Sequence, residues 1–193
     1  LKKKLYLIAN FDLINKQLQK IKSKMSIYKI NQINEISASN KLKVIDVPLN
    51  FKNPFNVSLK DSRKYVLKCF DLAHQLTQNK DFKGLINCPI NKRLLNNSKT
   101  IGVTEFLASK CKIKKDSEVM LIYNKKLSVV PLTTHINIKN VSKKINKSLI
   151  IKKVRTLQKD FLKLFNKKPR IGILGLNPHN AELFHNSEEI KII

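Results

Sequence analysis

Short apolar runs alternate with longer amphipathic stretches along the whole chain, a pattern typical of alternating strands and helices. The runs at 119–123 and 127–132 are separated only by the polar turn 124–126, which predicts a hairpin. The run at 171–176 is the last one and is expected to be buried. The predicted strands are residues 5–9, 43–47, 84–86, 119–123, 127–132 and 171–176.

Between these runs, apolar residues recur at the spacing of a helix with one buried face. Asp12 is the expected N-cap of the first helix, and the second helix is expected to start near Ser58 or Ser62. Residues 48–56 are rich in proline and asparagine, which predicts an irregular loop. The predicted helices run from Asp12 to Met25, from Ser58 or Ser62 to Leu76, from about Thr104 to Ala108, and from about Val141 to Phe165.

Strands separated by helices of this length favour an α/β layered fold with a largely parallel sheet. The 193 residues and 42% hydrophobic content suffice for one domain, or for parts of two, with a real core. No apolar run approaches the ~20 residues of a membrane span, so an integral membrane protein is not expected.

The chain is strongly basic, with 39 Lys and Arg residues against 13 Asp and Glu residues and a net charge of +26. A charge of this size is typical of nucleic-acid-binding proteins. The basic residues are almost all lysines, however, and they are scattered along the chain. Abundant Lys, Asn and Ile with scarce Gly and Arg are what A/T-rich coding produces. We therefore favour a solvated enzyme surface and expect no nucleic-acid partner, with RNA binding as the alternative.

The three cysteines, Cys69, Cys88 and Cys111, are odd in number and have no C-x-x-C spacing. This pattern argues against a disulfide framework and against a thiolate zinc site. It favours a protein of the reducing cytoplasm.

Two histidines lie where a predicted strand gives way to a loop. His135 ends the run Pro-Leu-Thr-Thr-His, and His179 ends the run Gly-Leu-Asn-Pro-His. Because ligands of open α/β sheets bind at the carboxyl ends of strands, both imidazoles could reach one divalent metal. A third ligand would have to come from elsewhere. The alternative is a pair of loop histidines bonded to backbone; His74 and His185 are weaker candidates.

A third motif, Gly-Val-Thr-Glu at 102–105, opens a predicted helix. A glycine turn that leads into a helix exposes N–H groups that suit a phosphate, and Thr104 would add a hydroxyl donor. Lys92 could reach the same edge of the sheet. The alternatives are that Thr104 only caps the helix and that Lys92 is solvated. The chain has neither a G-x-G-x-x-G nor a G-x-x-x-x-G-K-[ST] motif.

Together these motifs resemble the 4-hydroxythreonine-4-phosphate dehydrogenase family of vitamin B6 biosynthesis. The resemblance spans the chain from about Asp61 to its end and is weaker before that. Its most specific element is Leu-Asn-Pro-His at 176–179. The other matching segments are 84–89 with Lys92, Gly102 with Thr104 and Glu105, 133–135, and Glu188 with Glu189.

The resemblance implies a three-layer α/β/α fold of the isocitrate/isopropylmalate dehydrogenase type, here incomplete at both ends. Residues 1–100 would be part of the first α/β lobe. Residues 101–193 would be part of the second lobe, which carries two metal-ligand histidines. Family members are homodimers whose active sites are shared between subunits.

The implied reaction is the NAD- or NADP-dependent oxidation of the hydroxyl of 4-phosphohydroxy-L-threonine, followed by decarboxylation to 3-amino-2-oxopropyl phosphate. A divalent metal (zinc, magnesium or cobalt) would be held by three histidines, two of them His135 and His179. Thr104 would contact the substrate phosphate. The resemblance assigns no catalytic side chain and no cofactor-binding residue to this sequence.

Several positions depart from the family pattern. Val103 replaces a histidine near the substrate phosphate, which keeps open a related dehydrogenase acting on another phosphorylated hydroxy acid. Cys88 lies in Asn-Cys-Pro where Thr-Gly-Pro is usual, and residues 179–182 read His-Asn-Ala-Glu instead of His-Ala-Gly-Glu. The third metal histidine and an amino-terminal Gly-Asp-Pro segment are missing. We therefore expect a partial chain that is inactive alone.

Overall fold

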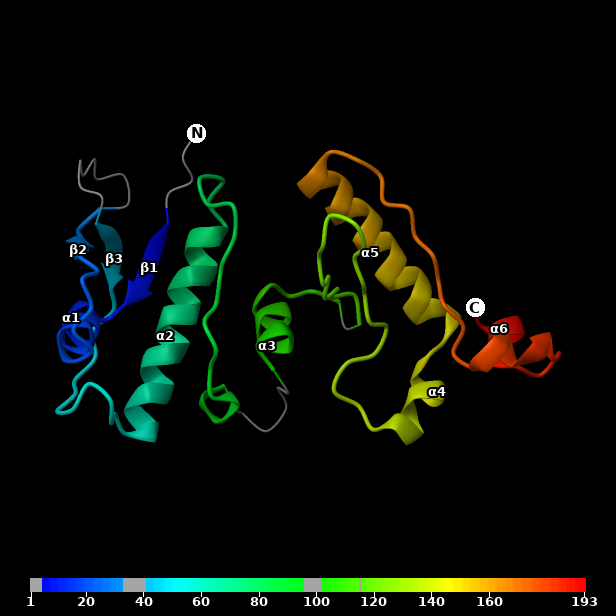
Figure 1. Ribbon diagram of the computed structural model, residues 1–193, viewed down its shortest axis with the longest axis horizontal. Helices are drawn as coiled ribbons and strands as arrows, with labels where there is room; N and C mark the ends of the chain where they lie inside the picture. The colour runs from blue at the N-terminus through cyan, green and yellow to red at the C-terminus, as the bar shows by residue number, and fades with distance from the viewer. Residues whose placement is uncertain (1–4, 33–40, 96–101, 115) are drawn as a thin grey trace. The chain divides into compact units, whose positions relative to one another are not determined.

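The computed structural model describes residues 5–32, 41–95, 102–114 and 116–193 (Figure 1). The chain divides into two compact units, Leu1–Thr100 and Ile101–Ile193. The sequence also suggests a division at residue 100, but the assignment of the halves to the two lobes of the family fold stays a prediction.

A three-stranded parallel sheet forms the centre of the first unit. Its strands are β1 (Tyr6–Ala9), β2 (Ile27–Ile30) and β3 (Leu42–Asp46), in the spatial order β1-β3-β2. Both edge strands run parallel to β3, and Val44 at its middle is 0% exposed. The predicted parallel sheet is confirmed, and the predicted strands at 5–9 and 43–47 are β1 and β3.

Two helices pack on this sheet, as Figure 1 shows for the first unit. Helix α1 (Phe11–Lys20) contacts β3, and helix α2 (Leu59–Thr77) contacts β1. Apolar side chains on the inner faces of the helices, such as Leu13 and Phe70, are buried. The arrangement is that of an α/β fold, in which the sheet hides its apolar strands beneath helices.

The start and end of α1 differ from the prediction. Its N-cap is Asn10, whose side chain accepts a hydrogen bond from the backbone N–H of Leu13 at 2.9 Å, and Asp12 lies in the first turn. The helix ends at Lys20, so Met25 lies outside it. Strand β2 follows and was not predicted, because its four residues continue an apolar spacing that also suits a helix.

The second unit is built around helix α5 (Lys147–Phe165), with the shorter helices α3 (Val103–Lys110), α4 (Val141–Lys144) and α6 (Glu188–Lys191). The prediction of one helix from 141 to 165 is wrong. Ile145 is extended (ψ 124°), and Asn146 starts α5 by accepting a hydrogen bond from the backbone N–H of Leu149 at 2.9 Å. Short 3-10 turns lie at Lys92–Leu94, Ile138–Asn140 and Pro178–Leu183.

Two predicted strands are not strands in the structure. Residues 84–86 and 171–176 are irregular, with Ile86 82% exposed and Leu174 88% exposed. An extended apolar segment becomes a strand only when a neighbour supplies backbone hydrogen bonds, and neither segment has such a neighbour among the described residues. The predicted hairpin is present as a single antiparallel bridge, in which Ile122 and Val129 exchange hydrogen bonds of 2.9 and 3.0 Å.

No helix within the described ranges is long and apolar enough to cross a lipid bilayer.

Candidate functional site

The loop 175–179, which carries the Gly-Leu-Asn-Pro-His motif, is held by two carboxylates of α6. Oε1 of Glu189 accepts hydrogen bonds from the backbone N–H groups of Leu176 (2.9 Å) and Asn177 (2.7 Å). The Asn177 side-chain amide donates to Oε2 of Glu188 at 3.0 Å and to Oε2 of Glu189 at 3.1 Å. The backbone N–H of Asn177, with the other amide donors around it, lowers the pKa of the Glu189 carboxyl below its ordinary value.

Gly175, the first residue of this loop, is closely packed against the Asn180 side chain. A Cβ at this position would overlap the Asn180 side chain and come to 3.4 Å from Oε1 of Glu189. Glycine therefore leaves the room that the Asn180 side chain occupies against this loop.

The chain turns left-handed directly after this loop. His179, Asn180, Ala181, Glu182 and Leu183 all have φ between 49° and 56°. Left-handed backbone costs roughly 1–2 kcal/mol per residue for most L-residues. Ala181 stands where the family pattern described above has glycine, so this chain keeps a costly conformation without the residue that adopts it freely.

His179 projects from this turn with 84% of its side chain exposed. Its Nδ1 lies 3.0 Å from Oε1 of Glu182. Because an ionised carboxylate only accepts hydrogen bonds, Nδ1 carries the proton of the neutral ring, and the lone pair is on Nε2. A histidine that binds metal through one nitrogen and donates from the other to a carboxylate is a common arrangement. The chemistry of His179 therefore fits a metal ligand.

His135 lies exposed in the loop that precedes the 3-10 turn Ile138–Asn140, and its φ of 53° is also left-handed. His135 and His179 do not lie at the ends of neighbouring strands, because 171–176 is not part of a sheet. Within the described ranges, no three His, Cys, Asp or Glu side chains are grouped so that they could hold a metal ion. A shared metal at His135 and His179 stays a prediction.

The weaker histidine candidates lie elsewhere. His74 is half-buried near the end of α2, with its Nε2 3.3 Å from the side-chain nitrogen of Gln78. His185 is exposed in the segment between Leu183 and α6. Neither position adds a ligand to the loop 175–179.

Thr104 lies exposed in the first turn of α3. The N-cap of this helix is Gly102, and no side chain forms a capping hydrogen bond, so the alternative that Thr104 caps the helix is wrong. The carboxylate of Glu105 folds back over the same helix end, where its Oε2 would lie 2.9 Å from a Cβ at Gly102. A phosphate at this end would have to displace that carboxylate. Lys92 begins a 3-10 turn, and its side chain lies outside the described part of the structure.

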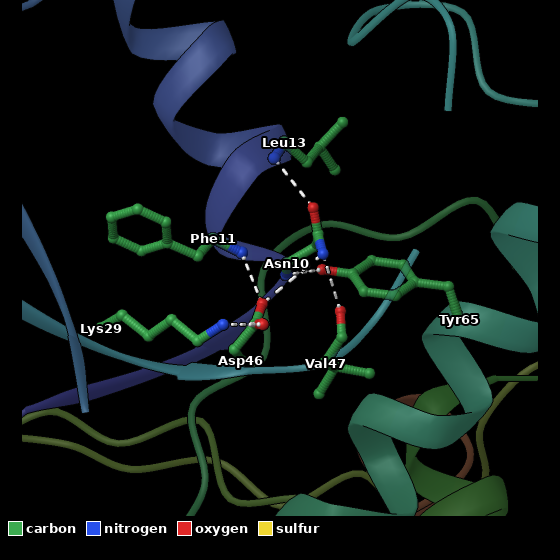
Figure 2. Close-up of polar contacts among 7 residues, drawn as sticks. All are labelled: Asn10, Phe11, Leu13, Lys29, Asp46, Val47 and Tyr65. Atoms are coloured by element: carbon green, nitrogen blue, oxygen red, sulfur yellow. Dashed lines mark hydrogen bonds and ion pairs between the residues drawn. The ribbon is translucent and has the colours of Figure 1, made fainter. Parts of the chain in front are cut away.

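Sequence reasoning missed a polar cluster at the carboxyl ends of β1 and β3, which Figure 2 shows. Asn10 is buried, and its side-chain amide donates to the backbone oxygen of Val47 at 3.1 Å. The backbone N–H of Asn10 donates to the Tyr65 hydroxyl at 2.7 Å, so α2 is joined to the end of β1. An asparagine directly after a strand and before a helical pattern was the available signal for this N-cap.

Asp46 completes this cluster from the end of β3 (Figure 2). Its Oδ1 accepts from the backbone N–H of Phe11 at 2.8 Å, and its Oδ2 accepts from Nζ of Lys29 at 2.7 Å. Burial alone would raise the pKa of Asp46, but the hydrogen bonds from Lys29 and Phe11 outweigh it and lower the pKa. The bond to Asp46 raises the pKa of Lys29. These polar atoms form hydrogen bonds with one another, so we assign the cluster a structural role: it joins β1, β2, β3 and α2.

Comparison with solved structures defines the class of protein. The chain superimposes on 4-hydroxythreonine-4-phosphate dehydrogenase from Klebsiella pneumoniae with a TM-score of 0.84 at 24% identity, over 97% of this chain and 58% of that one. The corresponding protein from Burkholderia phymatum gives a TM-score of 0.81 at 27% identity, over 96% of this chain and 58% of that one. The α/β class, with its parallel sheet between helices, is thereby confirmed.

The sequence comparisons identify the family. Residues 2–193 match the family model described as pyridoxal phosphate biosynthetic protein PdxA, and the chain belongs to this family. It is 34% identical over 177 residues to 4-hydroxythreonine-4-phosphate dehydrogenase of Wigglesworthia glossinidia brevipalpis, covering 90% of this chain and 53% of that protein. It is 45% identical over 113 residues to the Aquifex aeolicus protein of the same name, covering 57% of this chain and 35% of the relative. The chain thus spans about half the length, or less, of these two relatives.

Proposed function

We propose that this chain is part of an NAD- or NADP-dependent dehydrogenase that oxidises and decarboxylates 4-phosphohydroxy-L-threonine to 3-amino-2-oxopropyl phosphate. The observation that carries the proposal is the match of residues 2–193 to one family, together with the Gly-Leu-Asn-Pro-His loop held by α6. We further propose that the protein works in the reducing cytoplasm, in agreement with its free cysteines Cys69, Cys88 and Cys111, and as a homodimer with shared active sites.

We assign His135 and His179 as two ligands of a divalent metal, which is zinc, magnesium or cobalt. When bound, such an ion supplies polarisation of the substrate hydroxyl and stabilisation of developing negative charge. The protein's own part is to keep the Nε2 lone pair of His179 available, through the contact of 3.0 Å between Nδ1 and the Glu182 carboxylate. In this assignment, His135 and His179 are two of the three imidazoles that the family resemblance implies.

We assign Thr104 as a contact of the substrate phosphate. Its position in the first turn of α3 supports this role, because the N–H groups at the start of a helix and a nearby hydroxyl can all donate to phosphate oxygens once the Glu105 carboxylate is displaced. The hydride acceptor, NAD or NADP, supplies the redox chemistry, and the protein orients it against the substrate.

Titration with Co²⁺, followed by absorption and calorimetry, tests the metal assignment. We expect the 193-residue chain to bind Co²⁺ and the double variant His135→Ala, His179→Ala to lose this binding. His185→Ala is the control and should bind like the wild type. Unchanged Co²⁺ binding by the double variant contradicts the assignment. Tight RNA binding that weakens steeply with salt would instead support the RNA-binding alternative.

The chain alone should not form NADH steadily from 4-phosphohydroxy-L-threonine, because it holds only two of the three implied metal histidines. Steady NADH formation by the purified chain would show this to be wrong.

Val103 supports a second candidate within the same class, a dehydrogenase of another phosphorylated hydroxy acid. Valine cannot donate the hydrogen bond that a histidine would give near the phosphate. A full-length protein with this valine that binds other phosphorylated hydroxy acids better than 4-phosphohydroxy-L-threonine would favour this candidate. The variant Val103→His, prepared in the same protein, should then shift the preference back.

A further inference from the structure

We propose that Glu189 is a positioning residue, which fixes the loop 175–179 so that His179 can bind the metal. The inference rests on the proposed function, because it needs His179 to be a ligand. It adds a residue from a different segment, ten positions along the chain, to the machinery of that site.

The contacts at Glu189 restrain the backbone just before His179. One carboxylate oxygen, Oε1, accepts from two consecutive N–H groups, those of Leu176 and Asn177, at 2.9 and 2.7 Å. Two adjacent donors that meet at one oxygen define both the position and the orientation of the peptide between them. Charge-assisted hydrogen bonds of this kind are about twice as strong as neutral ones.

The Asn177 side chain adds a second restraint. Its Nδ2 lies 3.0 Å from Oε2 of Glu188 and 3.1 Å from Oε2 of Glu189, so the residue is held through both its backbone and its side chain. Only Pro178 separates Asn177 from His179, and the proline ring fixes its own φ. Few rotatable bonds therefore remain between the held peptide and the imidazole.

The surroundings of Glu189 favour a role in positioning over a role in core packing. Neither α6 nor the 3-10 turn Pro178–Leu183 contains a buried residue. The helix α6 is four residues long, and its buried neighbour is the N-cap Ser187. A carboxylate with several hydrogen bonds in a segment without an apolar core acts mainly on the geometry of the loop that it binds.

The experiment compares Co²⁺ affinity in the 193-residue chain with the variants Glu189→Ala and Glu189→Gln. Partners that orient a metal ligand typically change metal affinity by about 10- to 100-fold when they are removed, so we expect a loss of this size for Glu189→Ala. Glu189→Gln keeps an oxygen acceptor for the two N–H groups and should recover part of the affinity. Asp160→Asn, on the exposed side of α5, is the control for the loss of one negative charge.

Hydrogen exchange of the Leu176 and Asn177 amides is the second measurement. We expect faster exchange in Glu189→Ala, with an unchanged far-ultraviolet circular dichroism spectrum and unchanged protection in α5.

The outcomes separate the two proposals. If Glu189→Ala binds Co²⁺ like the wild type while the His135→Ala, His179→Ala variant does not, the positioning role is wrong and the metal assignment stands. If removal of both histidines leaves Co²⁺ binding unchanged, the metal assignment is wrong, and the positioning role falls with it.

Discussion

The buried N–H of Asn10 makes the Tyr65 hydroxyl important for the stability of the first unit. This N–H donates to the hydroxyl at 2.7 Å, and burial raises the pKa of Tyr65, so the phenol stays neutral. We expect Tyr65→Phe to lower the free energy of unfolding by about 1–3 kcal/mol, because it leaves a buried donor without its acceptor. Urea denaturation followed by circular dichroism measures this change.

Tyr123→Phe is the matched control. The Tyr123 ring is stacked on Phe165 with ring centroids 4.8 Å apart, and the residue is exposed, so removal of its hydroxyl should cost less than about 0.5 kcal/mol. Equal effects of the two substitutions would mean that water replaces the hydroxyl at Asn10.

The three cysteines should differ in their reactivity. Burial raises the pKa of Cys69 to about 11, whereas Cys88 and Cys111 are exposed. Because the thiolate is the reactive species, we expect iodoacetamide at pH 8 to modify Cys88 and Cys111 quickly and Cys69 only slowly. Peptide mass spectrometry over time measures the three rates. Urea should bring Cys69 to the rate of the other two, and fast labelling of Cys69 in the native chain would contradict its burial.

At the scale of elements, the start of α5 depends on one asparagine. The Asn146 side chain accepts from the Leu149 N–H at 2.9 Å, so Asn146→Ala should weaken the second unit by about 1 kcal/mol. Asn140→Ala is the control, since Asn140 precedes α4 without a capping hydrogen bond from its side chain. Thermal unfolding of the two variants provides the comparison, and an equal effect would show that the cap contributes nothing.

The same asparagine explains why the sequence predicted one helix where the structure has two. Ile145 and Leu149 both fit the apolar spacing, and both are buried, so periodicity continues through the break. The signal for the break was a capping residue, Asn146, within an otherwise helical pattern. Such a residue also occurs inside helices, and its backbone angles decide between the two cases.

Strands β1 and β3 could be predicted because each is a short β-branched or apolar run between turn signals. The equally apolar run 171–176 shows the limit of that reasoning. Apolar character predicts that a segment must be covered by other parts of the protein, but whether a neighbouring strand lies beside it is decided by the tertiary structure.

For the candidate site, the sequence indicated Thr104, His135 and His179. The contact between His179 and Glu182 depends on left-handed backbone at 179–183 that no periodicity predicts.

At the scale of the whole molecule, the exposed apolar segments should be detectable in solution. Ile86 and Leu174 are more than four-fifths exposed, at 82% and 88%. Exposed apolar surface binds the dye ANS, so we expect the 193-residue chain to increase its fluorescence. The variants Ile86→Thr and Leu174→Thr should reduce this signal. Lys125→Thr, in the exposed turn 124–126, should not. If both apolar variants left the fluorescence unchanged, these segments would not be the dye-binding surface.

The strand order of the first unit has a consequence for the time course of folding. β1 and β2 come first along the chain, yet neither pairs with the other, and both pair with β3. Tyr6 pairs with Lys43, and Ile27 pairs with Leu42, so each early strand can pair only after β3 has been synthesised. During synthesis the sheet therefore cannot begin until its central strand has left the ribosome, and then both pairings can form around one template. Since non-local pairing is slow, we expect the formation of β3 to set the folding rate of this unit.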